Sequence, residues 1–495
     1  MRENVHGGGM SRRHFMIGAA AVAGSPWLPS FAESKPNLRL GLLSDIHVSG
    51  LHGPSPNAYR KALERFRDAH VDGVCITGDL AIWGQIKELE CGAQIWFDVF
   101  PDDKLPDGSP VARLFCTGNH DDDGWSYQGA YKGYAKACLE EARKTSYFFH
   151  RQKTWKRLYR EDWEPIFYKE VKGYKFVLSN WMCRVERAPI AEGKIRNEKK
   201  TVGDWFAANG AELPSDRPFF FLQHDPPRGT CNAPDSQISR CDSVEAFEAL
   251  KRFPNCIALS GHTHYPTVDA KSIWQGEFTS INCGSTSGFA FTGEGRENGH
   301  SSHDGTGEME KLSDVMNCRQ GLLMDVYEDR ITIGRFEVLS GRATGPDWVI
   351  PLGAASEKPY RFDTRAAASM PPVFADDAKV SVRRIVEGQN RKKERHAQIE
   401  VKFPAVNGLA TNGDRAYDYC VDIVVCEAAG ERIVASRRVF SPMCLRPVED
   451  DVEEVSCLFA AKDVPVAGEV RFVVTPVNEW GKRGKPILSL PLELT

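Results

Sequence analysis

The chain has 495 residues, which is too long for a single hydrophobic core, so we expect two or three domains. Hydrophobic residues make up 41% of it and charged residues 26%, an ordinary globular composition that argues against a disordered or membrane-embedded body. The formal net charge of −4 gives no overall field for nucleic acid or an acidic membrane surface, and the basic run at 390–395 is local, so we expect no specific nucleic-acid binding.

The N-terminus resembles a bacterial twin-arginine export signal. Arg12 and Arg13 precede a short stretch rich in Ala and Gly that ends in Ser-Phe-Ala, with cleavage expected after Ala32. An uncleaved membrane anchor is the alternative, but Pro26, Pro29 and a length below the ~20 apolar residues of a spanning helix disfavour it. We therefore expect residues 1–32 to be a signal, and the mature protein to be periplasmic or extracellular with no membrane span.

From Leu38 onward, apolar runs alternate with helical patterns, which predicts a layered α/β domain over residues 33–363. A helix is expected to begin near Ser55 and Pro56. The predicted strands are short and apolar enough to be covered on both faces, and they lie at 38–45, 71–77, 111–117, 174–180, 218–223, 256–260 and 278–283. A hairpin at 321–339 closes this domain.

A segment rich in Ala, Ser and Pro at 364–378 is predicted to be a linker. Beyond it, runs at strand spacing with turn residues between them predict a small β-sandwich over residues 379–495. The closing stretch at 474–487 resembles the last hairpin of a fibronectin type III module. We therefore expect a fibronectin type III-like or immunoglobulin-like sandwich.

Fourteen cysteines in an exported chain permit disulfides without requiring them. Four lie inside apolar runs and are expected to be buried free thiols, namely Cys75, Cys116, Cys256 and Cys283. The candidates for disulfides are Cys231 with Cys241, which bracket a polar loop, and the C-terminal group of Cys420, Cys426, Cys444 and Cys457, whose pairing stays open.

Several predicted strands end in polar clusters of one chemical kind. These clusters contain Asp45 and His47, Asp79, Asn119 and His120, His224, and finally His262 and His264. Because the carboxyl ends of strands share one edge in an open α/β sheet, we expect these side chains to converge. Two metal ions about 3.5 to 4 Å apart need one bridging carboxylate among nitrogen and oxygen donors, and such donors suit Mn, Fe, Zn or Ni.

In chain order the clusters read DIH, GD, GNHD, H and GHTH, and this pattern resembles the calcineurin-like metallophosphoesterase family over roughly residues 38–340. The resemblance implies a four-layer αββα fold with two divalent or trivalent metal ions. The ligands that it implies are Asp45, His47, Asp79 and His264 for the first ion, and Asp79, Asn119, His224 and His262 for the second. Asp79 would then bridge the two ions.

The resemblance also implies hydrolysis of phosphomonoesters or phosphodiesters by a hydroxide that bridges the metals. His120 is the candidate to protonate or hydrogen-bond the leaving oxygen, with Asp121 holding its ring, although the matching histidine of the family is also described as steadying the phosphate. Purple acid phosphatases have a tyrosine where this chain has Ile82, so no tyrosinate-iron centre is expected. The presence of His47 favours the group that includes phosphodiesterases.

Three polar stretches are candidates for shaping the substrate pocket: 122–144 with Trp125 and Tyr127, 225–242 with Arg228, and 288–318. Ordinary solvated loops are the alternative for each stretch, and also for His300 and His303 as a third metal site. The substrate is expected to be a small-molecule, nucleotide or lipid phosphoester, with its identity and the oligomeric state left open.

Three other functions were weighed. A serine hydrolase is disfavoured because "GSTSG" at 284–288 has threonine in the middle position, and the zinc-peptidase motif His-Glu-x-x-His is absent. A non-catalytic surface or adhesion protein that uses the α/β domain as a scaffold and the sandwich for binding is the remaining alternative. It predicts missing ligands, yet every expected ligand type is present.

Overall fold

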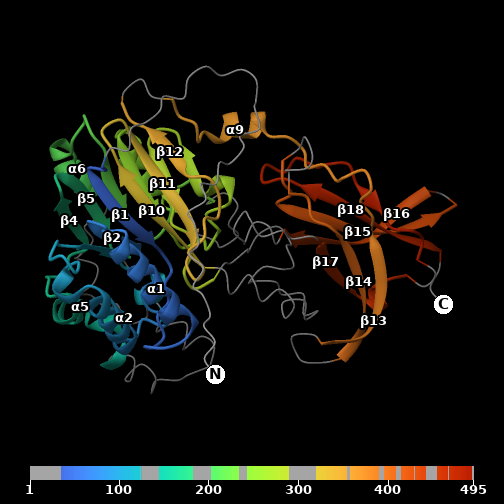
Figure 1. The fold of residues 1–495 in the computed structure, drawn as a ribbon, viewed down its shortest axis with the longest axis horizontal. Coiled ribbons are helices and arrows are strands. Elements are labelled where there is room, and N and C mark those ends of the chain that lie inside the picture. Colours follow the sequence, from blue (N-terminus) through green and yellow to red (C-terminus); the bar gives the residue numbers. More distant parts are fainter. Residues whose placement is uncertain are drawn as a thin grey trace, which may run out of the picture. The chain divides into compact units, whose positions relative to one another are not determined.

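Two six-stranded sheets form the centre of the N-terminal domain (Figure 1). The computed structural model describes residues 35–122, 124, 144–181, 202–232, 242–288, 319–353, 357–389, 395–407, 414–428, 430–441, 454–465 and 468–492. The predicted export signal, Trp125, Tyr127, His300 and His303 lie outside these residues.

The first sheet has the strand order β12-β11-β10-β1-β2-β3. Its strands are β1 (Leu38–Leu43), β2 (Gly73–Thr77), β3 (Ala112–Cys116), β10 (Gln320–Val326), β11 (Arg330–Glu337) and β12 (Trp348–Pro351). Strands β1, β2 and β3 are parallel, and β10, β11 and β12 extend the sheet in antiparallel pairs. The parallel part therefore brings the carboxyl ends of three strands to one edge.

The second sheet has the order β4-β5-β6-β7-β9-β8. Its strands are β4 (Ile166–Val171), β5 (Tyr174–Ser179), β6 (Phe219–Leu222), β7 (Cys256–Ser260), β8 (Ile273–Gln275) and β9 (Thr279–Asn282). Strands β5, β6, β7 and β9 are parallel, while β4 and β8 pair antiparallel at the two edges.

Side-chain alternation along β6 shows how the layers pack. Phe220 and Leu222 join the core that contains β1, whereas Phe219 and Phe221 join a separate core with helices α6 (Val202–Asn209) and α7 (Val244–Leu250). One face of the second sheet thus meets the first sheet and the other face meets helices.

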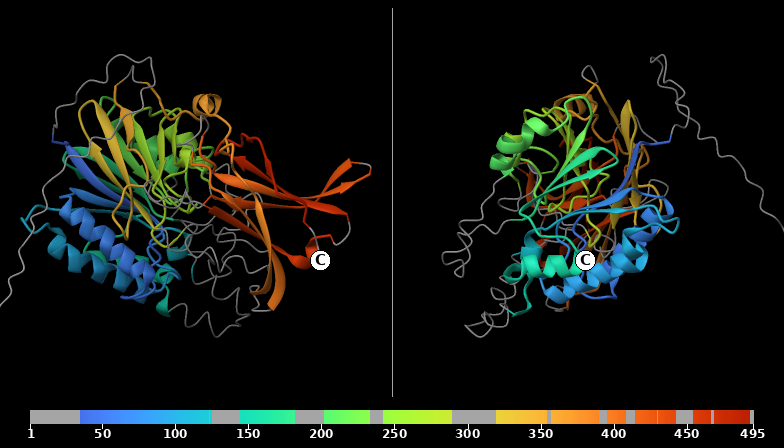
Figure 2. Two further views of the ribbon diagram at one scale, coloured as in Figure 1. Left: turned by 45° about the vertical axis from the view of Figure 1, so that its right-hand side comes forward. Right: turned by 90° about the vertical axis from the view of Figure 1, so that its left-hand side faces the viewer.

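Helices also cover the outer face of the first sheet (Figure 2). These helices are α1 (Pro54–Asp68), α2 (Ile86–Val99) and α5 (Arg151–Tyr159), and their apolar side chains share one core with β1 and β2. The layers therefore run helix, sheet, sheet, helix, and the predicted α/β class is confirmed. Among the described residues, no helix has both the length and the apolar character that crossing a bilayer requires.

The C-terminal region is all β and has its own core, in which Val401, Tyr419, Phe459 and Phe472 are buried. One antiparallel sheet has the order β13-β14-β17, with β13 (Ser381–Gln389), β14 (Arg395–Pro404) and β17 (Glu454–Ala460). The other has the order β16-β15-β18-β19, with β15 (Asp418–Glu427), β16 (Gly430–Phe440), β18 (Glu469–Val477) and β19 (Ile487–Leu488). We refer to this region as the C-terminal sandwich.

The predicted linker at 364–378 begins inside a helix, α9 (Phe362–Ala368). The Ala-rich sequence accounts for this helix, because alanine has the highest helix propensity. The later part of the segment already contributes to the sandwich, since Phe374 is buried in its core.

Cys75, Cys116, Cys256 and Cys283 are buried free thiols, as predicted. Of the disulfide candidates, Cys231, Cys420 and Cys426 are free thiols, so Cys231 does not form the proposed disulfide, and Cys241 and Cys444 lie outside the described residues. The Sγ atom of Cys231 instead lies 3.5 Å from the carbonyl oxygen of Ser272, in a buried position.

Candidate metal centre

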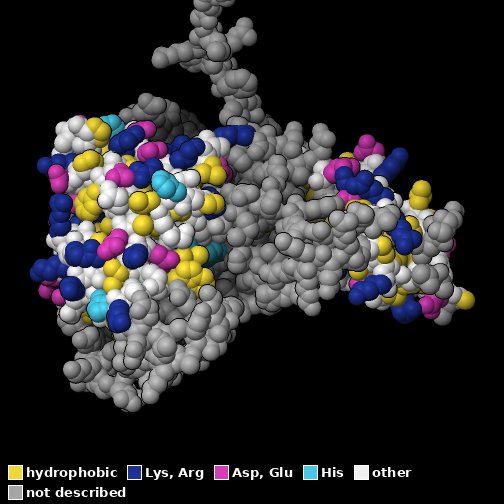
Figure 3. All heavy atoms as spheres, turned by 90° about the horizontal axis from the view of Figure 1, so that it is seen from below, with side chains coloured by type: hydrophobic (Ala, Val, Ile, Leu, Met, Phe, Trp, Pro, Cys, Tyr) yellow, Lys and Arg dark blue, Asp and Glu magenta, His cyan; other side chains and the backbone are white. Residues whose placement is uncertain are grey.

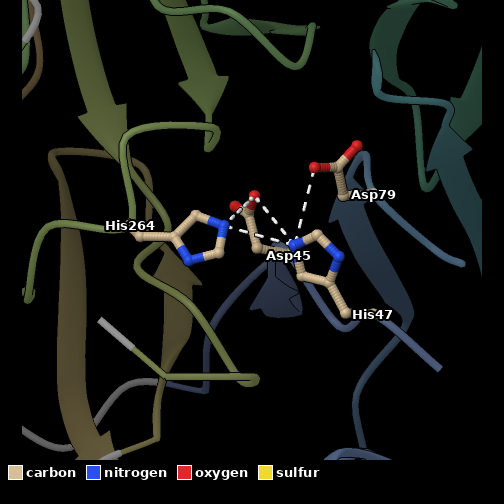
Figure 4. Close-up of side chains that lie close together, drawn as sticks. All are labelled: Asp45, His47, Asp79 and His264. Carbon is tan, nitrogen blue, oxygen red and sulfur yellow. Dashed lines mark hydrogen bonds and ion pairs between the residues drawn. The ribbon is translucent and has the colours of Figure 1, made fainter. Parts of the chain in front are cut away.

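The predicted ligands come together where the carboxyl ends of the parallel strands of both sheets meet. They form two groups, and within each group the donor atoms all lie within 4.8 Å of one another. Asp45, His47, Asp79 and His264 form the first group, and their side chains point toward a common centre (Figure 4). Asp79, His224 and His262 form the second group, so Asp79 belongs to both.

In the first group, imidazole nitrogens face two carboxylates. The Nε2 atom of His264 lies 2.9 Å from Oδ1 of Asp45, and Nε2 of His47 lies 3.6 Å from Oδ2 of Asp79. The two Nε2 atoms of His47 and His264 are 3.2 Å apart. Four nitrogen and oxygen donors from three loops thus surround one point.

In the second group, His224 stands at the centre. Its Nε2 atom lies 3.2 Å from Oδ2 of Asp79 and 3.1 Å from Nδ1 of His262. The side-chain oxygen of Asn119, which the sequence also assigned to this group, lies 3.0 Å from the same Nε2. The structure therefore brings all seven predicted ligands into one cluster.

In each carboxylate, one oxygen accepts a backbone N–H and the other faces the histidines. Oδ2 of Asp45 accepts the backbone N–H of His262 at 3.0 Å, which leaves Oδ1 facing His264. Oδ1 of Asp79 accepts the backbone N–H of His120 at 2.8 Å, which leaves Oδ2 facing His224 and His47. These bonds fix the carboxylates in orientations suited to binding a cation.

The histidine tautomers show that lone pairs converge. Nδ1 of His224 lies 2.7 Å from the carbonyl oxygen of Thr77, and Nδ1 of His264 lies 3.0 Å from that of Gly288. Since a carbonyl oxygen only accepts, each Nδ1 carries a proton, and loss of any second proton from a ring leaves the lone pair of Nε2 facing the cluster. Such backing of a ring nitrogen by a carbonyl is typical of metal-bound histidine.

The electrostatics of the cluster favour a bound cation. Burial, and then the neighbouring His120, lower the pKa of His47 to about 3, and burial together with His224 lowers the pKa of His262 to about 3. Burial also lowers the pKa of His224, but the carboxylates of Asp79 and Asp45 outweigh it and raise that pKa to about 10. His47 and His262 are therefore neutral donors beside two buried carboxylates, and a bound cation can replace the proton that those carboxylates hold on His224, so the donor set is compatible with a divalent metal centre.

The backbone at the ligands is held in an unusual conformation. Of the eleven non-glycine residues with positive φ in the described chain, five are predicted ligands, namely Asp45 (50°), His47 (42°), Asp79 (53°), His262 (66°) and His264 (53°). Left-handed φ at such residues costs of order 1–3 kcal/mol each and persists only where the surrounding structure enforces it. Its concentration here marks the cluster as functional.

Two glycines in the motifs allow the loops to approach the carboxylates closely. A Cβ atom at Gly118 would lie 2.2 Å from Oδ1 of Asp79, and one at Gly261 would lie 1.7 Å from Oγ of Ser44. No side chain fits at these distances, so the Gly of GNHD and the Gly of GHTH are required by packing against the neighbouring strand ends.

The prediction that Asp121 holds the His120 ring is wrong. Nδ1 of His120 lies 2.7 Å from the carbonyl oxygen of Ile82, which accepts its proton. The buried Asp121 carboxylate instead accepts the backbone N–H groups of Leu80, Ala81 and Gly118 at 3.1, 2.8 and 2.8 Å. Asp121 therefore shapes the loop that carries Asp79, because three backbone donors outcompete one ring nitrogen.

His120 itself lies beside the cluster and outside both donor groups. Its ring centroid is 4.6 Å from that of His47 in an edge-to-face arrangement, and the side chain is partly exposed. This position fits a group that contacts a substrate bound at the cluster.

Sequence reasoning missed Trp181, which follows β5 and flanks the second donor group. The centroid of its ring lies 6.0 Å from the ring centroid of His224 and 5.9 Å from that of His262. The rule that found the ligands also points to this residue, because β5 is another parallel strand of the second sheet and Trp181 comes just after its carboxyl end.

Of the three loops predicted to shape the pocket, most of 122–144 and of 288–318 lies outside the described residues. Arg228 is exposed and lies 3.7 Å from Asp242 in an ion pair, so its neighbour is a carboxylate of the same loop. On the face shown in Figure 3, basic and acidic side chains are interspersed, and no single sign of charge dominates the described part of it.

The chain was compared with known proteins. The calcineurin-like phosphoesterase family matches residues 38–266, a range that contains every predicted ligand. A comparison with curated proteins found no match.

Several solved structures are similar in fold at low identity. A dimetal phosphatase from Danio rerio has a TM-score of 0.38 and 12% identity, with 64% of this chain and 100% of that chain covered. A purple acid phosphatase from yellow lupin (Lupinus luteus) seeds has a TM-score of 0.39 and 12% identity, with coverage of 64% and 55%. GAP50, the anchor in the inner membrane complex of Plasmodium, has a TM-score of 0.37 and 12% identity, with coverage of 67% and 92%.

The family match and the geometry of the cluster agree. The matched range ends just after the GHTH block, and the five blocks stand at the strand ends where the donor atoms converge. Residues 38–266 therefore form a calcineurin-like phosphoesterase domain.

Proposed function

We propose that the protein is a metal-dependent phosphoester hydrolase whose centre holds two metal ions. The first ion takes the donor group of Asp45, His47, Asp79 and His264, and the second takes Asp79, Asn119, His224 and His262. The observation that carries this proposal is the membership of Asp79 in both donor groups, with lone pairs converging on either side of its Oδ2 atom.

The donor set indicates which ions fit and what they supply. Carboxylate, imidazole and amide oxygen without thiolate suit Mn, Fe, Zn or Ni. The chemistry that two such cations supply when bound is neutralisation of the phosphoryl oxygens and acidification of a water molecule. Both are needed because a phosphate ester anion repels an anionic nucleophile.

His120 is placed to act on the leaving group. With Nδ1 donating to the carbonyl oxygen of Ile82, a ring that also carries a proton on Nε2 can donate that proton to a substrate oxygen. We assign it the role of protonating or hydrogen-bonding the leaving oxygen as charge develops there. The backbone carbonyl of Ile82 holds the His120 ring. The side chain of Ile82 cannot bind a metal ion as the tyrosine of purple acid phosphatases does.

The substrate class we propose is a small-molecule phosphomonoester or phosphodiester, which includes nucleotides and lipid head groups. Trp181 supplies an aromatic surface beside the second donor group, suited to a base or another flat group of such an ester.

We also propose export by the twin-arginine signal and a fibronectin type III-like fold for the C-terminal sandwich. Seven antiparallel strands in one sheet of three and one of four support that fold.

The test is metal loading followed by an assay of two model esters. We expect the purified protein to take up two equivalents of Mn²⁺ or Zn²⁺ and to hydrolyse p-nitrophenyl phosphate, bis-p-nitrophenyl phosphate or both. Chelation should abolish the activity, and returning the metal should restore it. A protein that binds no metal and cleaves neither ester would instead favour a non-catalytic surface or adhesion protein.

A further inference from the structure

A short segment that begins three residues after His264 forms hydrogen bonds with polar side chains from several parts of the chain. We call residues 267–270 the strap. Its four residues are buried, with Thr267, Val268 and Asp269 exposed by 3% or less. Tyr265 and Pro266 alone separate the strap from His264, so little chain is available to absorb a displacement of the strap.

Side chains of the phosphoesterase domain and α9 hold the two ends of the strap. Oε1 of Gln320 accepts both the backbone N–H and the hydroxyl of Thr267, at 2.7 and 2.8 Å. Arg335 donates to the carbonyl oxygen of Thr267 at 2.9 Å, and Arg365 donates to that of Ala270.

Side chains of the C-terminal sandwich hold the middle of the strap and its last backbone N–H. Arg415 donates to the carbonyl oxygen of Val268 at 2.9 Å and pairs with Glu479 at 3.3 Å. Oε2 of Glu479 accepts the backbone N–H of Ala270 at 3.0 Å, and the hydroxyl of Tyr417 donates to Oδ2 of Asp269. The sandwich thus contacts three consecutive residues of the strap.

These contacts lie within one compact unit, Pro36–Thr495, and the contact between Tyr417 and Asp269 is shielded from water. Tyr417 is 2% exposed and Asp269 is 3% exposed. In such an environment hydrogen bonds to charged groups are stronger than at the surface, and losing one partner leaves the other unpaired.

The neighbouring ligands need this kind of support. His262 and His264 have φ of 66° and 53°, a conformation that persists only when the surrounding structure enforces it. Upstream, β7 fixes the chain at Ser260. Downstream of His264, the carbonyl oxygen of Pro266 accepts the hydroxyl of Ser272 at 2.8 Å and the strap follows directly, so the two together complete the frame in which both histidines sit.

We propose that the C-terminal sandwich positions His262 and His264 through the strap, with Tyr417, Arg415 and Glu479 as positioning residues. This inference rests on the proposed metal-dependent function. It gives the sandwich a structural part in the metal centre, in contrast to a separate module that only recruits a partner.

The experiment compares two matched variants of the full chain. Tyr417→Phe removes the hydroxyl that reaches Asp269. Tyr419→Phe also removes one hydroxyl, but that hydroxyl accepts the backbone N–H of Val406 at 2.8 Å, inside the sandwich. Zn²⁺ affinity is measured by competition with a coloured chelator, and amide hydrogen exchange over residues 262–270 is measured on the metal-free protein.

We expect Tyr417→Phe to weaken Zn²⁺ binding by about tenfold, the lower end of the range for residues that orient metal ligands. We also expect it to speed exchange over 262–270. Tyr419→Phe should leave both measurements as in the wild type, even if its melting temperature falls equally. Glu479→Gln, which weakens the pair with Arg415, serves as a second test if Tyr417→Phe does not fold.

Two outcomes separate the inference from the function on which it rests. Wild-type Zn²⁺ affinity and exchange in both Tyr417→Phe and Glu479→Gln would overturn the positioning role and leave the proposed function intact. A wild-type protein that binds no Zn²⁺ would overturn the proposed function, and the inference with it.

Discussion

The two six-stranded sheets contribute different chemistry to one centre. The first sheet supplies both carboxylates, Asp45 and Asp79, whereas the donors from the second sheet are imidazoles, His224, His262 and His264. The shortest nitrogen–carboxylate contacts cross between the sheets, at 2.9 Å from His264 to Asp45 and 3.2 Å from His224 to Asp79. His47 comes from the first sheet, but the contacts of His264 and His224 with the carboxylates form only when the sheets pack face to face, so core packing is a precondition of the site.

The largest effect is expected from Asp79→Asn, which removes the only carboxylate common to both donor groups. We expect loss of at least one metal equivalent and a fall in kcat/KM of at least about 10³-fold, since two ions contribute several kcal/mol and about 1.4 kcal/mol is tenfold. Metal content by elemental analysis and the p-nitrophenyl assays measure both.

The control for this variant is Asp325→Asn in the same sheet. Asp325 pairs with Arg39 at 2.6 Å near the surface, and it should change activity little. Equal losses in the two variants would show that sheet stability, and not the shared carboxylate, limits the activity.

A smaller effect is expected from His120→Asn, because His120 follows the first sheet but lies outside both donor groups. Metal content should stay at the wild-type level while kcat falls by about 10²- to 10⁴-fold, the usual contribution of a general acid. The loss should be larger for alkyl esters than for p-nitrophenyl esters, whose leaving group needs little protonation. His70→Asn, at an exposed position, is the control. Unchanged kcat in the metal-loaded His120→Asn protein would exclude the assigned role.

The smallest effect is expected from Trp181→Ala on the second sheet. We expect kcat and metal content to be retained and KM for an aromatic or nucleotide ester to rise about twofold to tenfold, because aromatic contacts contribute about 0.5–1.5 kcal/mol. Trp205→Ala serves as the control, since Trp205 lies on α6 and stacks with Tyr168. A KM that is unchanged for every ester would remove Trp181 from the substrate site.

The strands that are buried on both faces were all predicted from the sequence. β2, β6 and β7 consist of buried residues throughout, so their apolar runs are unmistakable. The missed strands β4, β8 and β12 are at sheet edges, and four of the six residues of β4 are partly or fully exposed. Edge strands have one open side and a mixed sequence, so their pattern is weak.

The metal ligands could be predicted because parallel strands bring their carboxyl ends to one edge, which turns five separate motifs into one site. The role of Asp121 could not be predicted in the same way. A carboxylate next to His120 in the sequence has several partners within reach, and only the fold shows that Leu80, Ala81 and Gly118 present their N–H groups to it. The strap was equally hidden, since its contacts join residues 53 to 209 positions apart along the chain.

The left-handed backbone at five ligands has a consequence for ion selectivity. Because these residues are locked by glycine contacts, carbonyl backing and cross-sheet bonds, the centre is preorganised and has little freedom to expand. Calcium favours six to eight oxygen ligands at about 2.3–2.6 Å in a flexible shell, and a rigid, nitrogen-rich frame offers neither. We expect Ca²⁺ to compete poorly here, even where it is far more abundant than the transition metals.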